Sequence, residues 1–159
     1  MSGIIGRIGS KSGVIGLLDD AQRNAWHVYR SAIVDYSTDA YIAFDGTVFI
    51  GSNITLSAGQ ITVTEPGIYL CSFGFCDFNK TRMHSWEVHL EGARIGSGAR
   101  ILMNPVSAGA ADNVGGSSMT HPIRCDAGDE LGINGTGHIN GNAGASTTWF
   151  TGAKIGEKS

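Results

Sequence analysis

The residues best suited to chemistry in this chain of 159 residues are its histidines, but their spacing forms no catalytic or metal-binding motif. The histidines are His27, His84, His89, His121 and His138. The sequence has no HExxH pair, which would place two ligands on one helix face. It also lacks the G-x-S-x-G turn that exposes the nucleophile of serine hydrolases. We therefore expect surface or core histidines, and no enzymatic activity.

Three cysteines could form a disulfide or a metal site, but their number and spacing favour neither. They are Cys71, Cys76 and Cys125. An odd number without CxxC spacing is not typical of a disulfide framework or of a zinc site. We expect reduced, buried thiols that act as small apolar side chains, and we expect no cofactor.

One acidic turn offers the hard oxygen ligands that calcium prefers. It contains Asp126, Asp129 and Glu130. Because Asp129 and Glu130 are adjacent where a strand begins, their side chains diverge and cannot share a substrate. A turn that needs only Asp and Gly explains the same residues, so a calcium site and a structural turn both remain open.

Composition limits the classes of protein that this chain can belong to. Its mass of 16.6 kDa fits one domain with a complete core. The net charge is -3, and the first 18 residues carry only Arg7 and Lys11 as cations, which are too few to bind a nucleic acid. No apolar run is long enough to span a membrane, and the start lacks the apolar core of a signal peptide. We expect folding in a cytoplasm.

The elements that must position any site are strands. From Trp26 onward, short runs rich in Val, Ile, Thr and aromatic residues alternate with clusters of Gly, Asn, Asp and Ser. This pattern predicts an all-β, two-sheet sandwich or jelly roll over 26–159, preceded by a helical turn or linker at 19–25 and an extended arm at 1–18. The expected strands are 26–36, 41–50, 60–64, 67–78, 83–90, 94–103, 117–124, 130–134 and 146–155.

Two of these strands have different patterns. In the stretch HSWEVHL, Trp86 and Val88 face one way while Glu87 and His89 face the other, which predicts one buried and one wet face. The stretch GIYLCSFGFCDF is apolar on both faces. One face carries Tyr69, Cys71, Phe73 and Phe75. The other carries Ile68, Leu70, Cys76 and Phe78.

That second apolar face needs a cover, because a two-sheet sandwich buries only one face of each sheet. Adjacent Trp149 and Phe150, which must point to opposite faces, give the same indication. The chain has no helices to form a third layer, so we predict self-association. The predicted interface residues are Ile68, Leu70, Cys76 and Phe78. A moderately apolar but uncovered sheet is the alternative.

Three ordered motifs resemble those of the globular heads of the complement first component's recognition subunit and of tumour necrosis factor relatives. The stretches ITVTEPGIYLCSF, CDAGDELGI and STTWFTGAKI resemble that family's G-x-Y-x-F, L-x-x-G-D-x-V-x-L and F-S-G phrases. The matching residues are Gly67, Tyr69, Gly128, Asp129, Leu131, Ile133, Phe150, Thr151 and Gly152. Cys71 and Cys125 stand where the family usually has larger apolar residues. The resemblance implies a jelly roll that forms a homotrimer through its inner sheet, with 67–78 in that sheet and 83–90 in the outer one.

The arm repeats one phrase, SGIIG at 2–6 and SGVIG at 12–16. An extended peptide of this kind can place its branched side chains in pockets of a partner while its glycines let the two backbones approach. The predicted anchors are Ile4, Ile5, Ile8, Val14 and Ile15. The phrase resembles the start of short jelly-roll proteins encoded by tailed bacteriophages.

Together the two resemblances imply a structural virion protein, a capsid decoration or cement protein. It would assemble in the bacterial host cytoplasm and sit as a trimer on the outer capsid surface, with its arm on the major capsid protein or another virion protein. The alternative is a receptor-binding head of a tail or capsid fibre that recognises a host surface glycan through the loops at 104–116 and 134–145. The candidate contacts there are Asn104, Asn113, His138, Asn140 and Asn142. A third reading makes the arm a tail on a cellular domain.

Overall fold

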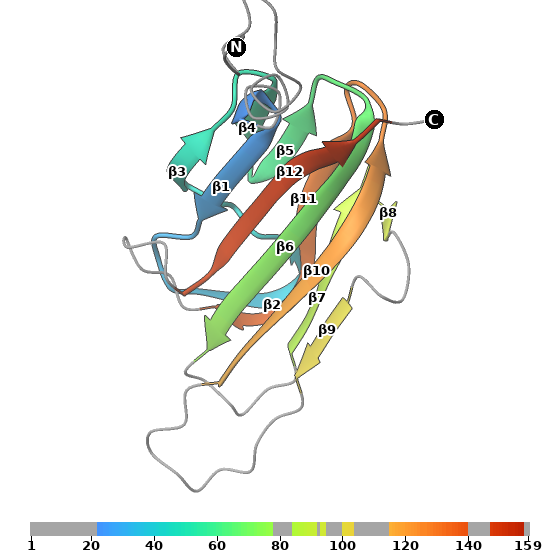
Figure 1. Cartoon of the computed structure of the whole chain (residues 1–159). Coiled ribbons are helices and arrows are strands. Elements are labelled where there is room, and N and C mark those ends of the chain that lie inside the picture. The colour runs from blue at the N-terminus through green and yellow to red at the C-terminus, as the bar shows by residue number, and fades with distance from the viewer. Residues whose placement is uncertain are drawn as a thin grey trace, which may run out of the picture.

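The computed structural model describes residues 22–77, 84–91, 93–94, 100–103, 115–139 and 147–157. In this part of the chain two antiparallel sheets pack face to face, as the sequence predicts (Figure 1). Several predicted contact residues lie outside the described residues: Ile4, Ile5, Ile8, Val14, Ile15, Phe78, Asn104, Asn113, Asn140 and Asn142. The side chains of Cys76 and His138 are also outside the description.

Sheet A has five strands and faces the viewer in Figure 1. Its order is β10 (Gly115–Cys125), β6 (Gly67–Asp77), β12 (Trp149–Gly156), β1 (Ala25–Tyr29) and β3 (Gly46–Ile50). A helical turn at Gln22 and Arg23 leads into β1. The long β6 lies between β10 and β12 and pairs with the edge strand β10 along its whole length. The stretch with two apolar faces is therefore an inner strand of sheet A.

Sheet B has seven strands and lies behind sheet A. Its main order is β4 (Ile54–Ser57), β5 (Gln60–Val63), β11 (Glu130–Ile139), β7 (His84–Leu90) and β8 (Ala93–Arg94). Two further strands, β2 (Val34–Tyr41) and β9 (Arg100–Met103), pair with β11 and β7. The alternating stretch 84–90 thus belongs to the second sheet, as expected.

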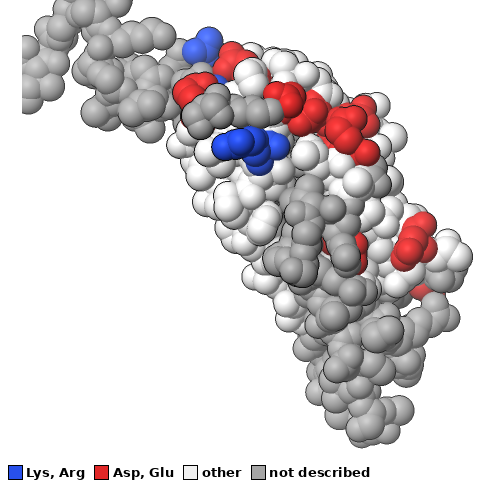
Figure 2. Space-filling model, turned by 90° about the vertical axis from the view of Figure 1, so that its right-hand side faces the viewer, with Lys and Arg blue, Asp and Glu red and all other residues white. Residues whose placement is uncertain are grey.

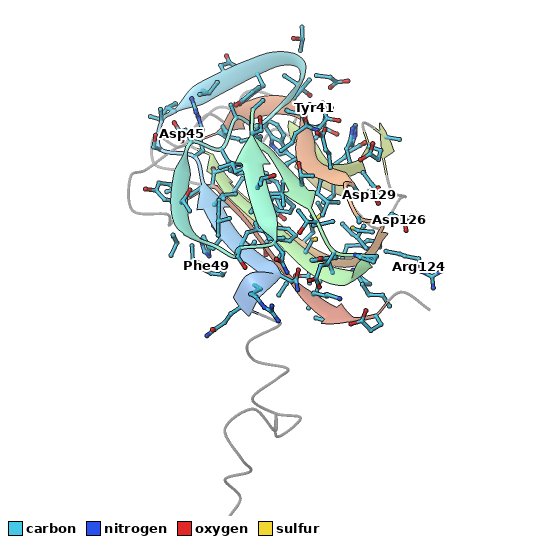
Figure 3. The ribbon with its side chains drawn as sticks, turned by 90° about the horizontal axis from the view of Figure 1, so that it is seen from above. Tyr41, Asp45, Phe49, Arg124, Asp126 and Asp129 are labelled. Atoms are coloured by element: carbon cyan, nitrogen blue, oxygen red, sulfur yellow. The ribbon has the colours of Figure 1, made fainter. Side chains whose placement is uncertain are left out.

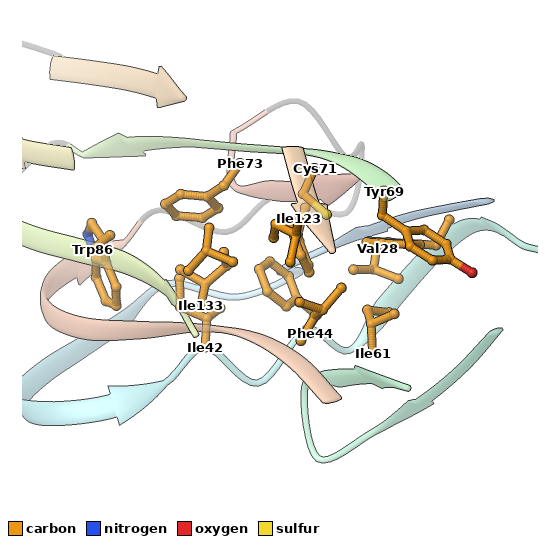
Figure 4. Packing of buried hydrophobic residues seen from close by; sticks show 14 of the residues in the cluster. Val28, Ile42, Phe44, Ile61, Tyr69, Cys71, Phe73, Trp86, Ile123 and Ile133 are labelled. Atoms are coloured by element: carbon orange, nitrogen blue, oxygen red, sulfur yellow. The ribbon is translucent and has the colours of Figure 1, made fainter. Parts of the chain in front are cut away.

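The core between the sheets is aromatic and fully buried (Figure 4). Trp26 packs edge-on against Phe150, with ring centroids 5.4 Å apart, and Phe73 packs against Trp86 of the other sheet at 6.5 Å. Trp26 lies over Gly152 in the neighbouring strand, where an added Cβ would approach the indole to 2.3 Å. Because this contact leaves no room for a side chain, position 152 must be glycine.

The buried thiols behave as the sequence predicts. Cys71 and Cys125 are free and buried, and they belong to the same apolar cluster as Tyr69. Burial raises the pKa of the Cys71 thiol well above its ordinary value, and the nearby Cys125 adds to this effect. The thiolate is the reactive form, so Cys71 is a packing residue and not a nucleophile.

The first two predicted strands, 26–36 and 41–50, are wrong as continuous strands, because the chain crosses between the sheets in each. It leaves sheet A after Tyr29 and returns to it at Gly46. Asp45 stabilises the chain where it crosses between the sheets. Its carboxylate accepts hydrogen bonds from the Ser31 N–H, the Ser31 hydroxyl and Arg30 Nη1 at 2.7 to 2.8 Å. Burial alone would raise the pKa of Asp45, but the Ser31 bonds and the Arg30 charge outweigh it and lower that pKa.

Two other boundaries also differ from prediction. The short strand β4 forms a hairpin with β5, although the sequence indicated no strand there. Strand β11 continues to Ile139, whereas the prediction ended it at Asn134 and treated 134–145 as a loop. The extension pairs with β2, and the candidate contact His138 lies on this strand, opposite Asp35. Its buried glycines at 135 and 137 carry no apolar side chain, so periodicity could not reveal the strand.

Candidate interaction face on the five-stranded sheet

The outer face of sheet A, the side turned away from the core, is the most unusual surface of the described chain. Two exposed large hydrophobic residues, Leu70 at 40% and Phe49 at 45% exposure, lie on it. Val48 and Ile155 are more exposed still, at 57% and 59%, and lie at irregularities of the β1–β3 and β6–β12 pairings. A water-exposed sheet normally carries polar residues at such positions, so this face has the composition of an interface.

Two of the predicted interface residues on β6, Ile68 and Leu70, point to this face. Tyr69 and Cys71 are buried in the core, whereas Leu70 between them is exposed and lies opposite Ala153 and Pro122. Ile68 is half-buried on the same side and lies opposite Arg124. The alternation of side chains along this stretch therefore predicted correctly that Ile68 and Leu70 point away from the core. Their role in an oligomer stays a prediction.

An aromatic row crosses the middle of the face and was not found from the sequence. The row consists of Phe49 on β3, His27 on β1 and Trp149 on β12. The His27 ring lies between the other two, with centroid distances of 6.4 Å to Phe49 and 6.2 Å to Trp149. Trp149 covers Gly74 on β6, where an added Cβ would come within 2.6 Å of the indole. The sequence did contain one indication of the orientation of His27, because His27 lies between the core residues Trp26 and Val28 and must point to the opposite face.

His27 is the titratable group at the centre of this face. Its Nε2 atom is buried and has no hydrogen-bond partner among the described residues. Burial lowers the pKa of His27 below its ordinary value of 6.5, because removing water disfavours the charged form. The neutral imidazole is therefore the form that suits this position.

Formal charge is scarce on this face. Of the side chains that the described strands of sheet A direct outward, only Arg124 carries a full charge at neutral pH, and it lies on the edge strand β10. Next to Trp149 the surface has a shallow, uncharged hollow of about 330 Å³. The hollow is lined by Gly74, Phe75, Gly116, Ser117, Ser118, Thr147 and Trp149.

The outer face of sheet B differs in chemistry. His89 lies between Tyr41, whose hydroxyl is 3.2 Å from Nδ1, and Glu87, whose carboxylate is 3.5 Å from Nε2. Burial raises the pKa of Tyr41, and the negative charge of Glu130 raises it further. Figure 3 looks along the sandwich and shows Tyr41 on the opposite side from Phe49 and Arg124.

One carboxylate of the acidic turn, that of Asp129, and two of its backbone N–H groups are hydrogen-bonded within the fold. Asp129 Oδ2 accepts a hydrogen bond from the Asp126 N–H at 2.7 Å, and Glu91 Oε1 accepts one from the Glu130 N–H at 2.6 Å. Figure 2, which looks onto the side of the sandwich that carries β10 and β8, shows most of the acidic side chains toward one end. Within the described ranges, no three His, Cys, Asp or Glu side chains gather closely enough to hold a metal ion. These hydrogen bonds favour the structural turn.

No helix in the described part of the chain has the length and apolar character needed to cross a membrane.

The strand order and the core together define a jelly roll of the tumour necrosis factor type, and comparison with solved structures agrees. The chain is similar to the structure of Eiger TNF from S. frugiperda, with 18% identity, a TM-score of 0.67, and coverage of 86% of this chain and 94% of that one. It is also similar to murine APRIL at pH 8.5, with 14% identity, a TM-score of 0.64, and coverage of 83% and 98%. At these identities the likeness concerns the fold alone. No protein-family model and no curated protein matches the chain.

Proposed function

We propose that the protein is a homotrimeric jelly-roll head with a structural role and no enzymatic activity, and that the outer face of sheet A is its subunit interface. The observation that carries this proposal is the exposed apolar set on that face, with Leu70 and Phe49 uncovered and almost no charge around them. The family resemblance of the three sequence motifs supports the same sheet as the interface.

The size of the face is adequate for a stable contact. Strands about 4.8 Å apart and about 3.4 Å per residue give a five-stranded sheet of this length a face of roughly 600 Å². A standard interface buries about 800 Å² on each partner, so this sheet with its flanking residues reaches the required range.

Sedimentation of a charge variant tests the interface. Leu70→Glu places an unpaired carboxylate in the centre of the contact, so we expect the wild type to sediment as a trimer at micromolar concentration and the variant as a monomer. Thr55→Glu makes the matched change at an exposed position on the outer face of sheet B and should leave the trimer intact. A wild type that sediments only as a 16.6 kDa species would contradict the proposal.

The virion role rests on the arm. The described strands begin at Ala25. We assign the paired phrases SGIIG and SGVIG to contact with a partner, and the trimer to the outer surface of a capsid as a decoration or cement protein. Three arms on one trimer would increase the avidity for the shell.

Deletion of residues 1–18 tests this anchoring. The truncated trimer should lose binding to purified capsids that lack the protein, while its sedimentation stays unchanged. A control variant that replaces only the spacer residues Ser10 and Lys11 with alanine should still bind, because both phrases, SGIIG and SGVIG, remain. Equal capsid binding by the truncated and full-length trimers would remove the anchoring role.

The alternative, a receptor-binding head on a tail or capsid fibre, is favoured by one observation. The hollow beside Trp149 combines an aromatic ring with the hydroxyls of Ser117, Ser118 and Thr147, which are groups that can contact a sugar. Images of whole particles separate the two roles, because copies over the entire shell indicate decoration and copies at one vertex indicate a tail or fibre.

A further inference from the structure

His27 occupies a position on the outer face of sheet A that accepts only an uncharged ring. Phe49 lies on one side of it and Trp149 on the other, and its Nε2 atom is buried without a hydrogen-bond partner among the described residues. Within the sheet, His27 lies opposite Phe49 on β3 and opposite Thr151 on β12. A second copy of the chain seated on this face would remove the remaining water from the imidazole.

We propose that His27 makes the self-association of this protein pH-dependent, so that subunits hold together while His27 is neutral and separate when it is protonated. The inference rests on the proposed homotrimer, whose interface contains His27. A protonated imidazole in a face of apolar and aromatic groups has lost its hydration without gaining a counter-charge, and this is the costly arrangement for a buried ion.

The groups that surround His27 supply no compensating charge. On its own strand the outward neighbours are Ala25 and Tyr29, and the phenol of Tyr29 is titratable only far above neutral pH. On β12 the neighbours are Trp149, Thr151 and Ala153, and on β3 the neighbour is Phe49.

The nearest charges are directed elsewhere or lie at a distance. Arg30 and Asp45 pair with each other at 2.8 Å beyond the end of β1. Lys154 pairs with Glu65 and Glu157, and Arg124 lies on β10, three strands away from β1.

The two flanking rings compensate the cation only weakly. A cation is attracted to an aromatic face within about 6 Å of the centroid. The two ring centroids lie 6.2 and 6.4 Å from that of the imidazole, at the limit of this range, and their planes are tilted by 33° and 53° to it. Loss of hydration is therefore the dominant effect on protonation.

The sign of the pH dependence follows from this environment. Burial lowers the pKa of His27 in the folded chain, and a covering subunit lowers it further. The free subunit therefore binds protons at a higher pH than the assembled one, and its own pKa already lies below the ordinary value of 6.5. Association is strongest at pH 6.5 and above, and it weakens as the pH falls through the lowered pKa of the free subunit.

Sedimentation equilibrium of the full-length chain at pH 7.5 and pH 5, at constant ionic strength, tests the proposal. Acidification should lower the trimerisation constant of the wild type. The expected factor is about ten for each His27 in the trimer and for each unit by which assembly lowers the pKa of His27. His27→Gln replaces the imidazole with a polar side chain that does not titrate. Its trimerisation constant should be nearly the same at both pH values. Circular dichroism at both pH values verifies that the subunits stay folded.

His89→Gln is the matched control, because His89 lies on the outer face of sheet B and should leave the acid response intact. If the glutamine variant does not associate at all, His27→Phe supplies an apolar ring, and it should be trimeric at both pH values. A wild type that is equally trimeric at both pH values, or a His27 variant that keeps the acid response, overturns the role of His27 and leaves the homotrimer standing. A wild type that is monomeric at pH 7.5 overturns the homotrimer itself.

Discussion

The two outer faces of the sandwich share one architecture and differ in chemistry. Both belong to antiparallel sheets that cover the same core, and on each an aromatic side chain lies across a glycine of the neighbouring strand, Trp149 over Gly74 on sheet A and Tyr41 over Gly132 on sheet B. Around Tyr41 the neighbours are hydrogen-bonded and charged, as with His89 and Glu87. Around Trp149 they are uncharged.

This difference supports the proposal that the outer face of sheet A, and not that of sheet B, is the subunit interface. The described strands of sheet A carry four exposed large hydrophobic residues, namely Val48, Phe49, Leu70 and Ile155, whereas none is found among the sheet B side chains whose exposure the structure describes. The remaining one, Ile33, lies where the chain crosses between the sheets. Leaving several apolar side chains in water lowers solubility with no benefit to the fold, whereas a second copy recovers their burial energy.

The largest expected effect comes from removing the core that both faces share. Gly152→Val would force a side chain against the Trp26 indole, because even a Cβ would approach it to 2.3 Å. We expect the free energy of unfolding to fall by about 3 kcal/mol or more, measured by denaturant unfolding of the full-length protein at one fixed concentration. Gly156→Ala is the control on the same strand, since nothing lies within 4 Å of its Cβ position, and it should change stability little. Similar midpoints for the two variants would contradict this packing.

The next largest effect compares the two outer faces through one aromatic substitution on each. Trp149→Ala removes the largest side chain of the outer face of sheet A, and we expect association to weaken by about 2 kcal/mol for each subunit contact, as for aromatic residues at the centre of interfaces. Tyr41→Ala removes the corresponding ring of sheet B and should leave the trimer unchanged. Sedimentation of both variants gives the measurement, and equal weakening would erase the contrast between the faces.

A smaller effect concerns the edge of sheet A. Asp45→Asn removes a carboxylate that binds Ser31 and Arg30, and we expect a loss of about 1 kcal/mol, since the exposed side chain is partly screened by water. Because the pKa of Asp45 is lowered in the folded chain, its contribution is present at neutral pH and disappears as the pH falls below the ordinary value of 3.8. Unfolding curves of the variant and the wild type should therefore converge at low pH.

This acid response concerns the folding of the chain below pH 3.8, whereas that of His27 concerns the association of subunits. An Asp45→Asn variant that kept the full stability difference at pH 2 would contradict the assignment.

The smallest effect is expected on sheet B. Glu87→Gln removes the carboxylate that lies 3.5 Å from His89 Nε2, and such contacts near a surface contribute about 0.5 kcal/mol or less. Thermal unfolding should shift by a degree or two, and the sedimentation profile should not change. Loss of the trimer in this variant would contradict the assignment of the subunit interface to sheet A.

Much of the fold was predictable because alternation is a local property. The buried positions of β6 and β7, the opposite directions of Trp149 and Phe150, and the burial of Cys71 all follow from period-two patterns read over a few residues. The crossing at Arg30 and the extension of β11 to Ile139 were missed. The first interrupts an apolar run without a glycine or proline, and the second proceeds through glycines that carry no pattern.

The candidate face was predictable only in part. Parity found Ile68 and Leu70, because both lie on one strand. It could not find the row of His27, Phe49 and Trp149, because these residues come from three strands and are widely separated in sequence. His27 therefore looked like one of several scattered histidines.

The sequence by itself determined that this chain is a β-sandwich with one strand apolar on both faces, because the spacing of side chains along a strand decides which of them share a side. The tertiary structure alone decided which residues surround each other across strands. Strand order depends on pairing between distant segments. It placed β1 between β3 and β12, so that an uncharged aromatic row lies on the same outer face as Leu70. The chemistry of that row, and the environment that lowers the pKa of His27, come from this order.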